Sequence, residues 1–381
     1  MADETQTNFF EELKEWSERK LRLLEKYVEP AAQILGASHG LVYYIDGFAG
    51  RGVYDDKAQT KGSPVRIAKL AEKFERENRT YRLNCVNVEA NSDNFQNLAS
   101  STEPFGDKVQ NLIGSFGENT DKILQIIGVH PAVCFLDPFG VKGIDLAALE
   151  KIVSRKAATD LWIRFDPITV RRLDGFFDDD SPKSKKQFGI LPGIYGVQDW
   201  NYLHSRLSGT TPEERLNSAL KFYIDQIVSL YVRTRGKGYV GAYAIKTITG
   251  QIKYHLVFAT AHPRGIILAS DIICDVEESY QIEVREFNDS RPHQISMFAT
   301  QPSKEEIFAA KVEQLKADIW EADHGKMLSH DQIYLSILGN WFGRIKGMHL
   351  NAALKSMKSV GQITNVDGPI SDYRTKFKFK K

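Results

Sequence analysis

The sequence predicts an α/β fold built on a doubly wound, mostly parallel sheet. In five short segments, apolar residues stand at both odd and even positions and do not simply alternate with polar ones. This is expected of strands that helices cover on both sides. Segments with helical spacing of their apolar residues alternate with them, and one begins at Ser63-Pro64, a typical helix start. Repeated β-α units of this kind predict a Rossmann-like sheet. The five strand segments are residues 41–46, 82–89, 109–114, 132–137 and 160–166.

Length and composition indicate one large α/β domain followed by a small one. The chain has 381 residues, of which 42% are hydrophobic and 26% are charged. Its net charge of +1 does not favour binding of a polyanion by bulk electrostatics. No apolar run approaches the roughly 18 residues of a membrane span, and the first residues lack the pattern of a signal peptide. We therefore expect a cytoplasmic protein, with its three separated cysteines reduced.

Further segments complete the first domain. Residues 1–40 contain an amphipathic helix, which we expect to break near Pro30 and to pack on the core. After the fifth strand, residues 167–235 read as a helical insertion, and two strand-like runs around Gly250 then predict an antiparallel hairpin at the sheet edge. Parallel strands that end in such a hairpin are the arrangement of class I methyltransferases. The predicted methyltransferase domain spans residues 41–300.

Residues 301–381 predict a winged helix-turn-helix domain, because helical segments are followed by two alternating strands around an Asp-Gly-Pro turn. This segment is also basic. We expect it to bind nucleic acid, with Asn351, Lys355 and Lys358 on one helix face and His349 on the same helix. The alternative is a winged helix that serves only to pack against the main domain.

The first strand leads into a glycine-rich turn with the pattern acid-x-Phe-x-Gly-x-Gly, formed by Asp46, Phe48, Gly50 and Gly52. A P-loop would need a Lys-Ser/Thr pair, which is missing, and a dinucleotide fingerprint would place Asp55 at its third glycine. S-adenosylmethionine carries a cationic amine and no phosphate, so an acid at this strand end favours it. The pattern therefore predicts an S-adenosylmethionine site.

A second acid supports this prediction. Glu89 ends the next strand, where an acid would hydrogen-bond the ribose hydroxyls of the cofactor. The fourth strand ends in Asp137-Pro138-Phe139-Gly140, which departs from the [DNS]PP[YFW] tetrapeptide of amino-group methyltransferases because its aromatic residue is third. It is similar to the tetrapeptide of the tRNA guanine-N2 dimethyltransferases. We expect the Asp137 side chain and the Pro138 carbonyl to accept hydrogen bonds from an exocyclic amine, while the Phe139 ring stacks on the base. The alternative role of Asp137 is to cap the next helix.

Three arginines are candidates for contact with a substrate phosphate. They are Arg51 in the glycine loop, Arg66 in the next helix and Arg164 in an apolar strand. The alternatives are solvated surface arginines and, for Arg164, an ion pair in the core. His255 and His262 flank an apolar run, but no third ligand has suitable spacing, so we expect no metal site.

With these motifs together, the chain resembles the three-Cys-motif partner protein family, TcmP. The resemblance rests on "WSERKLRLLEKYV", "YYIDGFAGRG", "KGSPVRIA", "FLDPFG", "DLWIRF", "HLVFATAHPRG" and "LSHDQIY…FGRIKGMHLNAAL". It implies a methyltransferase-like domain, a C-terminal winged helix and a neighbouring three-Cys-motif protein that resembles radical SAM enzymes. The family commonly has Gly-Asp after the third strand. This chain has Gly114-Ser115 there, and Glu118 is the acid that could replace the missing adenine contact.

Two functions remain open from the sequence. One is a methyltransferase that uses S-adenosylmethionine to modify an exocyclic amino group of a DNA or RNA base, in a modification or phage-defence context; a duplex base would be flipped out. The other is a binding module that keeps the fold but recruits the three-Cys-motif partner to nucleic acid.

Overall fold

The computed structural model describes residues 14–138, 144–166, 191–197, 200–207, 209, 211–289 and 303–380. The chain divides after His262 into two compact units. The predicted domain boundary after residue 300 lies later in the chain than this division. The difference arises because helix α12 (Pro263–Asp289) belongs to the C-terminal unit, where it contacts α14 (His330–Trp341).

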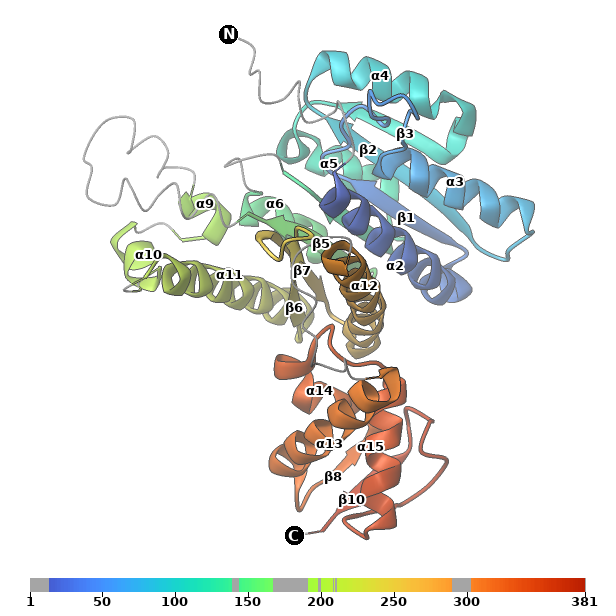
Figure 1. Cartoon of the computed structure of the whole chain (residues 1–381). Coiled ribbons are helices and arrows are strands. Elements are labelled where there is room, and N and C mark those ends of the chain that lie inside the picture. Colours follow the sequence, from blue (N-terminus) through green and yellow to red (C-terminus); the bar gives the residue numbers. More distant parts are fainter. Residues whose placement is uncertain are drawn as a thin grey trace. The chain divides into compact units, whose positions relative to one another are not determined.

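The N-terminal unit is built on a seven-stranded sheet with the order β3-β2-β1-β4-β5-β7-β6 (Figure 1). The first five strands are parallel, whereas β7 runs antiparallel to both of its neighbours. This order, with an antiparallel hairpin at one edge, is that of a Rossmann-like methyltransferase sheet, as predicted. The strands are β1 (Leu41–Asp46), β2 (Arg82–Glu89), β3 (Val109–Ile113), β4 (Ala132–Leu136), β5 (Thr159–Phe165), β6 (Tyr239–Lys246) and β7 (Ile252–Thr260).

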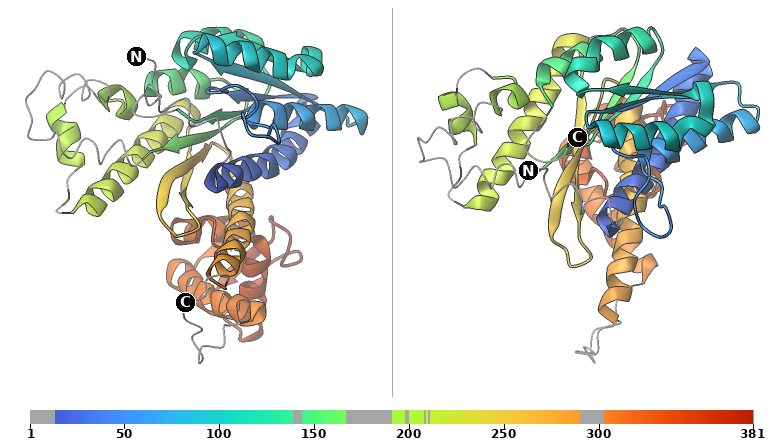
Figure 2. Two further views of the ribbon diagram at one scale, coloured as in Figure 1. Left: turned by 45° about the horizontal axis from the view of Figure 1, so that its top comes forward. Right: turned by 90° about the horizontal axis from the view of Figure 1, so that it is seen from above.

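Helices cover both faces of this sheet (Figure 2). One face carries α2 (Glu15–His39), α3 (Ser63–Arg76) and α4 (Ser92–Thr102), which a 3-10 turn, η1 (Glu103–Lys108), follows. The other face carries α5 (Phe116–Ile127), α6 (Leu146–Val153) and α11 (Pro212–Arg235). Two short helices, α9 (Leu191–Tyr195) and α10 (Trp200–Arg206), contact α11. Because helices cover both faces of the sheet, the residues that point to either side of the parallel strands are apolar.

Helix α2 corrects one prediction, because it continues through Pro30 to His39. Tyr27 and Val28 before the proline and Ala31 and Ala32 after it are all buried against the sheet. Packing on both sides of Pro30 thus outweighs the backbone hydrogen bond that a proline cannot donate. The Tyr27 ring contacts Trp162 and Phe258 edge-on, with ring centroids 5.2 Å and 5.1 Å away.

The C-terminal unit combines helices with a small antiparallel sheet of order β8-β10-β9. After α12 come α13 (Lys304–Asp323), β8 (Met327–Ser329), α14, α15 (Gly347–Ser359), β9 (Ile363–Asn365) and β10 (Lys376–Phe379). The predicted helical segments and the two strands are present, and the Ser329 side chain caps α14. Strand β8 is not predicted by the sequence, because three residues are too few to show an alternating pattern.

Candidate functional site

The turn after β1 is held in place by its neighbours in the sheet. The Gly47 amide donates to the Phe135 carbonyl of β4, and the Ala49 amide donates to the Val88 carbonyl of β2, each at 2.9 Å. Gly50 and Gly52 have φ values of 63° and 78°, which favour glycine. The glycine pattern in the sequence thus corresponds to a turn that needs left-handed backbone at both positions.

Glu89 connects this turn with the end of β2. Its carboxylate accepts from the Gly50 amide at 2.8 Å and from the Asn91 amide at 2.7 Å. The amides of Gly47, Ala49 and Gly50 are therefore already used inside the protein. A phosphate-binding loop presents such amides to its ligand, so this turn, with a carboxylate beside it, is unsuited to a pyrophosphate.

Asp46 lies beneath the turn and is completely buried. Burial raises its pKa to about 6, although hydrogen bonds from Ser63 and from the Phe48 amide oppose the rise. The Tyr44 hydroxyl also donates to it, at 3.2 Å. Asp46 does not line the cavity described next. The structure therefore shows Asp46 supporting the turn through its hydrogen bonds, and its contact with a cofactor stays a prediction.

A cavity of about 630 Å³ opens at the carboxyl ends of the parallel strands. Six of the predicted cofactor residues line it, namely Phe48, Gly50, Gly52, Glu89, Gly114 and Ser115. Asp137 and Arg164 line the same cavity. Glu89 ends β2 and Asp137 follows β4, and these strands are the two neighbours of β1. The cavity therefore joins the predicted cofactor half and the predicted acceptor half of the site.

Ser115 and Glu118 form a capping box at the start of α5. The Ser115 hydroxyl and amide donate to Glu118 Oε2 at 2.7 Å and 2.8 Å, and these bonds lower the pKa of Glu118. Glu118 does not line the cavity. The acid that could have replaced the missing adenine contact is therefore engaged in capping its own helix.

Asp137 is held between two cations from distant segments. Its Oδ2 pairs with Lys20 of α2, and its Oδ1 accepts from Arg164 Nη1 of β5 at 3.2 Å. Burial would raise the pKa of Asp137, but Lys20 and Arg164 lower it below its usual value. The alternative of a helix cap does not apply, because Asp145 caps α6 with a bond of 2.9 Å from the Ala147 amide. Pro138 is buried beside Asp137, whereas Phe139 and Gly140 lie outside the described residues.

Lys20 is a site residue that the sequence does not predict. Its side chain is only 6% exposed, and its ammonium lies 5.6 Å from the centre of the Phe135 ring. In the sequence it stands among the charged residues of an amphipathic helix, and such a pattern does not show which cation turns inward. The N-terminal helix therefore contributes to the cavity as well as to the core.

The three predicted arginines differ in their surroundings. Arg51 lines the cavity and forms an ion pair with Asp55. Arg66 bridges α3 to α2 through Glu18 and, at 3.2 Å, Glu25, and it does not line the cavity. Arg164 also pairs with Asp166 at 2.9 Å, and its guanidinium carbon lies 4.5 Å from the centre of the Tyr254 ring. Arg164 thus forms ion pairs, as the alternative interpretation expected, and it lines the cavity together with Asp137.

The candidate nucleic-acid residues of the C-terminal unit separate into two groups. Lys355 and Lys358 are exposed on α15, whereas His349 is buried and its Nδ1 accepts from the Lys346 amide at 3.0 Å. Asn351 lies at a half-buried position and contacts His330 Nε2 at 2.9 Å. The structure therefore leaves the two lysines available and assigns His349 to the packing of the unit.

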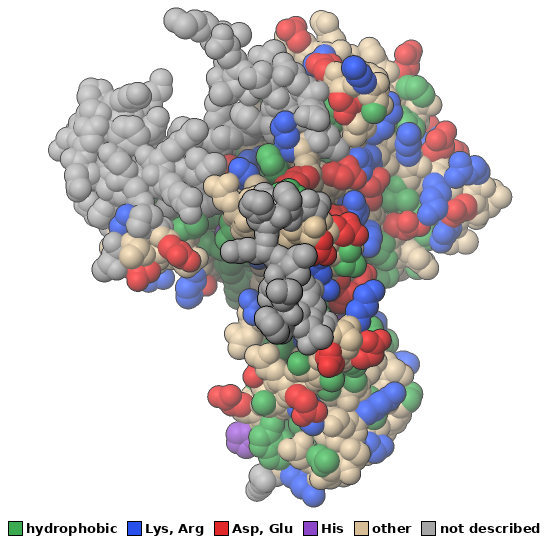
Figure 3. Space-filling view, in the orientation of Figure 1, with side chains coloured by type: hydrophobic (Ala, Val, Ile, Leu, Met, Phe, Trp, Pro, Cys, Tyr) green, Lys and Arg blue, Asp and Glu red, His purple; other side chains and the backbone are tan. Residues whose placement is uncertain are grey.

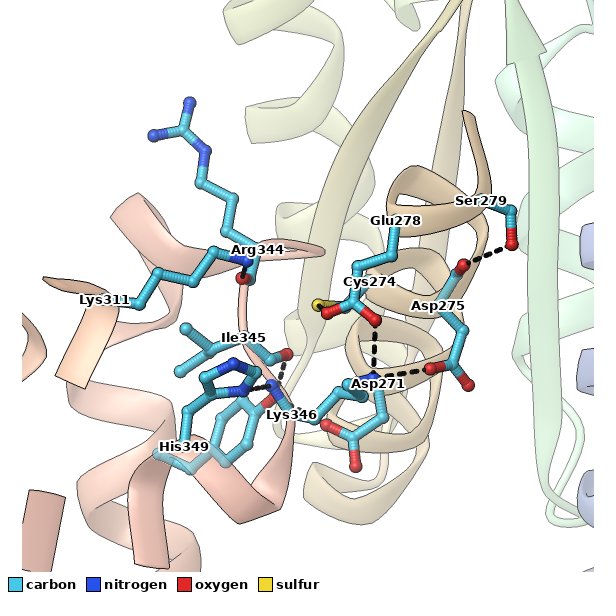
Figure 4. Close-up of polar contacts among 11 residues, drawn as sticks. Asp271, Cys274, Asp275, Glu278, Ser279, Lys311, Arg344, Ile345, Lys346 and His349 are labelled. Atoms are coloured by element: carbon cyan, nitrogen blue, oxygen red, sulfur yellow. Dashed lines mark hydrogen bonds and ion pairs between the residues drawn. The ribbon is translucent and has the colours of Figure 1, made fainter. Parts of the chain in front are cut away.

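Figure 4 shows how α15 is fixed to α12. The Lys346 ammonium donates to Asp275 Oδ1 and to Glu278 Oε2, both at 2.8 Å, just before α15 begins. On the face shown in Figure 3, acidic and basic side chains are intermixed, in accord with the small net charge.

The histidines of the β7 region do not form a metal site with their surroundings. In the part of the chain that the structure describes, no group of three or more His, Cys, Asp or Glu residues is arranged to hold a metal ion. His255 is buried in β7, where burial lowers its pKa to about 4. None of the described helices is long and apolar enough to cross a membrane.

No family model matches the sequence, and no curated protein matches it. Among solved structures, the chain is similar to an O-methyltransferase from Bacillus cereus in complex with S-adenosylhomocysteine, with 14% identity, a TM-score of 0.36, and coverage of 68% of this chain and 86% of that one. It is also similar to the O-methyltransferase TomG from Streptomyces achromogenes in complex with S-adenosylmethionine, with 11% identity, a TM-score of 0.34, and coverage of 68% and 94%. A Legionella pneumophila protein has 10% identity and a TM-score of 0.38, with coverage of 73% and 94%. At these levels of similarity, the strand order of the sheet remains the evidence for the fold.

Proposed function

We propose that this protein is a methyltransferase that binds S-adenosylmethionine in the cavity of its N-terminal unit. The observation that carries the proposal is the cavity itself, which brings the glycine turn, Glu89 and Asp137 together at the carboxyl ends of the strands. Glu89 would hold the ribose hydroxyls, because each carboxylate oxygen keeps acceptor capacity beyond its one amide bond. The bound cofactor would supply an electrophilic methyl group on a sulfonium.

The residues present fit such a cofactor better than a nucleotide phosphate. The turn amides of Gly47, Ala49 and Gly50 already have acceptors, and the Glu89 carboxylate faces the cavity. A carboxylate there repels phosphate and attracts hydroxyl groups or a cation. Phe48 lies against Phe116, with ring centroids 6.4 Å apart, and both line the cavity. This apolar wall suits the neutral parts of the cofactor.

The proposed acceptor is an exocyclic amino group of a nucleic-acid base. Asp137 would accept one N–H of the amine and hold its nitrogen toward the methyl group, which makes the reaction effectively unimolecular. Because the Lys20 and Arg164 cations lower the pKa of Asp137, its carboxylate stays ionised at neutral pH and remains an acceptor. The proton lost from the methylated nitrogen would leave along this hydrogen bond.

Nucleic acid would reach the site with help from the C-terminal unit. Its element order, helix, strand, two helices and two strands, supports a winged helix-turn-helix domain. Lys355 and Lys358 are exposed on α15, and Lys376 and Lys378 are exposed on β10. Lysines at such positions suit contacts to phosphates. A three-Cys-motif protein is proposed as the partner on the resemblance to TcmP alone.

A second candidate is a recruiting module without catalysis. It is favoured by Glu118, whose engagement with Ser115 leaves the adenine side of the cavity without the acid that the family commonly places there. Such a module would bind nucleic acid through the C-terminal unit and would transfer no methyl group.

Methyl transfer from labelled S-adenosylmethionine to a panel of DNA and RNA separates the two candidates. The enzyme proposal predicts labelled nucleic acid with the wild type and at least a hundredfold lower rate with Asp137→Ala, which removes the acceptor. Asp121→Ala is the matched control, because Asp121 pairs with Lys151 and neither residue lines the cavity. Nucleic-acid binding without any labelled product from the panel would support the recruiting module.

A further inference from the structure

Asp137 presents a carboxylate with a cationic donor on each of its two oxygens. Lys20 donates to Oδ2 and Arg164 Nη1 donates to Oδ1 at 3.2 Å. All three side chains line the cavity. The acceptor half of the site therefore carries a row of three groups in the order donor, acceptor, donor.

Both flanking cations keep donors for a ligand. An ammonium has three N–H bonds, and among the described residues Asp137 is the only hydrogen-bond partner of the Lys20 ammonium. A guanidinium has five, of which Arg164 uses one toward Asp137 and one toward Asp166. Its Nε is buried without a hydrogen-bond partner in the described part of the chain, so the donors left for a ligand are the remaining N–H groups of Nη1 and Nη2. Lys20 and Arg164 can thus donate hydrogen bonds to a ligand while their ion pairs with Asp137 stay intact.

The amino bases differ in what flanks the exocyclic amine. In adenine, N6 lies between N1 and N7, which are both acceptors, so its edge reads acceptor, donor, acceptor. In cytosine, N4 lies between the N3 acceptor and an apolar C5–H. In guanine, N2 lies between the N3 acceptor and the N1–H donor. The N1–H would then face Lys20 or Arg164, which are donors and cannot accept it. Adenine alone matches all three groups of the row.

We propose that the methyl acceptor is the N6 amine of adenine, held with Lys20 and Arg164 on N1 and N7 and Asp137 on the amine. This inference rests on the proposed function and narrows its substrate to one base. In the reaction, the bond between N6 and the methyl carbon forms as the sulfonium bond to that carbon breaks. The electron pair of the broken bond would stay on sulfur, so that S-adenosylhomocysteine is the other product. The N6 proton would pass along the hydrogen bond to the Asp137 carboxylate and from there to solvent, which restores a neutral secondary amine. Lys20 and Arg164 orient the base, and Asp137 orients the nitrogen.

The test uses single-stranded oligothymidylates, and their uridine RNA counterparts, that each carry one adenine, cytosine or guanine. Thymine and uracil have no exocyclic amine, so each oligonucleotide offers a single acceptor. The full-length protein should methylate the adenine oligonucleotide at least tenfold faster, in kcat/KM, than the other two. Replacing adenine by 1-deazaadenine or 7-deazaadenine removes one flanking acceptor. Each replacement should lower kcat/KM by about tenfold to a hundredfold, the usual loss for one hydrogen bond to a charged donor.

A variant of one cation identifies its partner atom. The two deaza analogues should each lower kcat/KM in the wild type. In Lys20→Met, one of these two losses should disappear while the other remains, because the ammonium that would bind one ring nitrogen is no longer there to tell adenine from that analogue. Lys26→Met is the matched control, since Lys26 is exposed on the same helix and does not line the cavity. It should leave both penalties unchanged.

The outcomes separate this inference from the proposed function. Faster methylation of cytosine or guanine, or full rates with both deaza analogues in the wild type, would overturn the adenine assignment and leave the methyltransferase standing. No label in any oligonucleotide, together with no binding of S-adenosylhomocysteine, would overturn both.

Discussion

Lys20 and Asp137 form an ion pair across 117 residues of sequence, joining helix α2 to the end of β4. The side chains are only 6% and 11% exposed, so both charges are largely removed from solvent. Removal of Lys20 would leave Asp137 with Arg164 as its one remaining cation among the described residues, and loss of one partner of a buried ion pair is destabilising. The N-terminal helix is thereby tied to the acceptor half of the cavity.

The first prediction concerns this pair. Lys20→Met should lower the free energy of unfolding by about 3 kcal/mol at pH 7 and raise the pKa of Asp137. A lowered folded-state pKa contributes stability above the unfolded pKa, and this contribution is lost as pH falls through the folded value. The advantage of the wild type over the variant should therefore shrink toward low pH in urea unfolding. A double variant with Asp137→Asn that is no more stable than Lys20→Met alone would contradict the pairing.

The second prediction concerns Asp46, whose pKa of about 6 lies above the ordinary value of 3.8. A raised carboxyl pKa favours the protonated folded state, so stability should fall as pH rises from about 4 to 6. The fall attributable to Asp46 should be roughly 3 kcal/mol, and Asp46→Asn should remove it, because the amide keeps an acceptor for the Phe48 amide. Urea unfolding across this range checks it. Asp93→Asn, at an exposed position, should retain the wild-type slope.

The third prediction concerns the glycine turn. A Cβ at Gly47 would lie 2.5 Å from Leu136 Cδ2 and 2.9 Å from Phe116 Cδ2, so Gly47→Ala should destabilise the N-terminal unit by about 1–3 kcal/mol. Gly117→Ala is the matched control, because a Cβ at Gly117 would meet no atom of the described residues within 4 Å and alanine favours the helix. Equal melting temperatures of the two variants would contradict the packing described for the turn.

The fourth prediction concerns the C-terminal unit. Lys355→Gln and Lys358→Gln should each weaken nucleic-acid binding without regard to sequence and should reduce the slope of log K against log salt by about 1. Fluorescence anisotropy of a labelled duplex at several salt concentrations measures both effects. Lys304→Gln, at an exposed position at the start of α13, serves as the control. If all three variants bind alike, α15 does not contact phosphates.

Much of the fold could be predicted from the sequence, because buried strands and capped helices leave local patterns. The runs around Val42, Val86 and Val133 all lie in strands of the large sheet. Side-chain direction at strand ends leaves no such pattern. Asp46 turns beneath its own loop while Glu89 turns into the cavity, and both simply follow apolar runs in the sequence. Lys20 required the packing of α2 on the sheet, which brings together residues far apart in the chain.

The role of Glu118 shows a similar limit. Its position three residues after Ser115 is typical of a capping box, yet a carboxylate near a cofactor loop is equally typical of a ligand contact. The sequence pattern fits both. The structure distinguishes the two roles, because the Ser115 amide and hydroxyl both donate to the Glu118 carboxylate. Glu118 therefore caps the start of its own helix.

Calorimetric titration with S-adenosylhomocysteine measures whether the cavity binds the cofactor, and it needs no knowledge of the methyl acceptor. The cavity predicts binding to the wild type and to Glu118→Gln, which keeps the cap but alters an acid outside the cavity. It predicts at least tenfold weaker binding to Glu89→Ala, which loses the carboxylate proposed to hold the ribose. No heat of binding to the wild type at millimolar ligand, or equal affinity for the wild type and Glu89→Ala, would contradict the account.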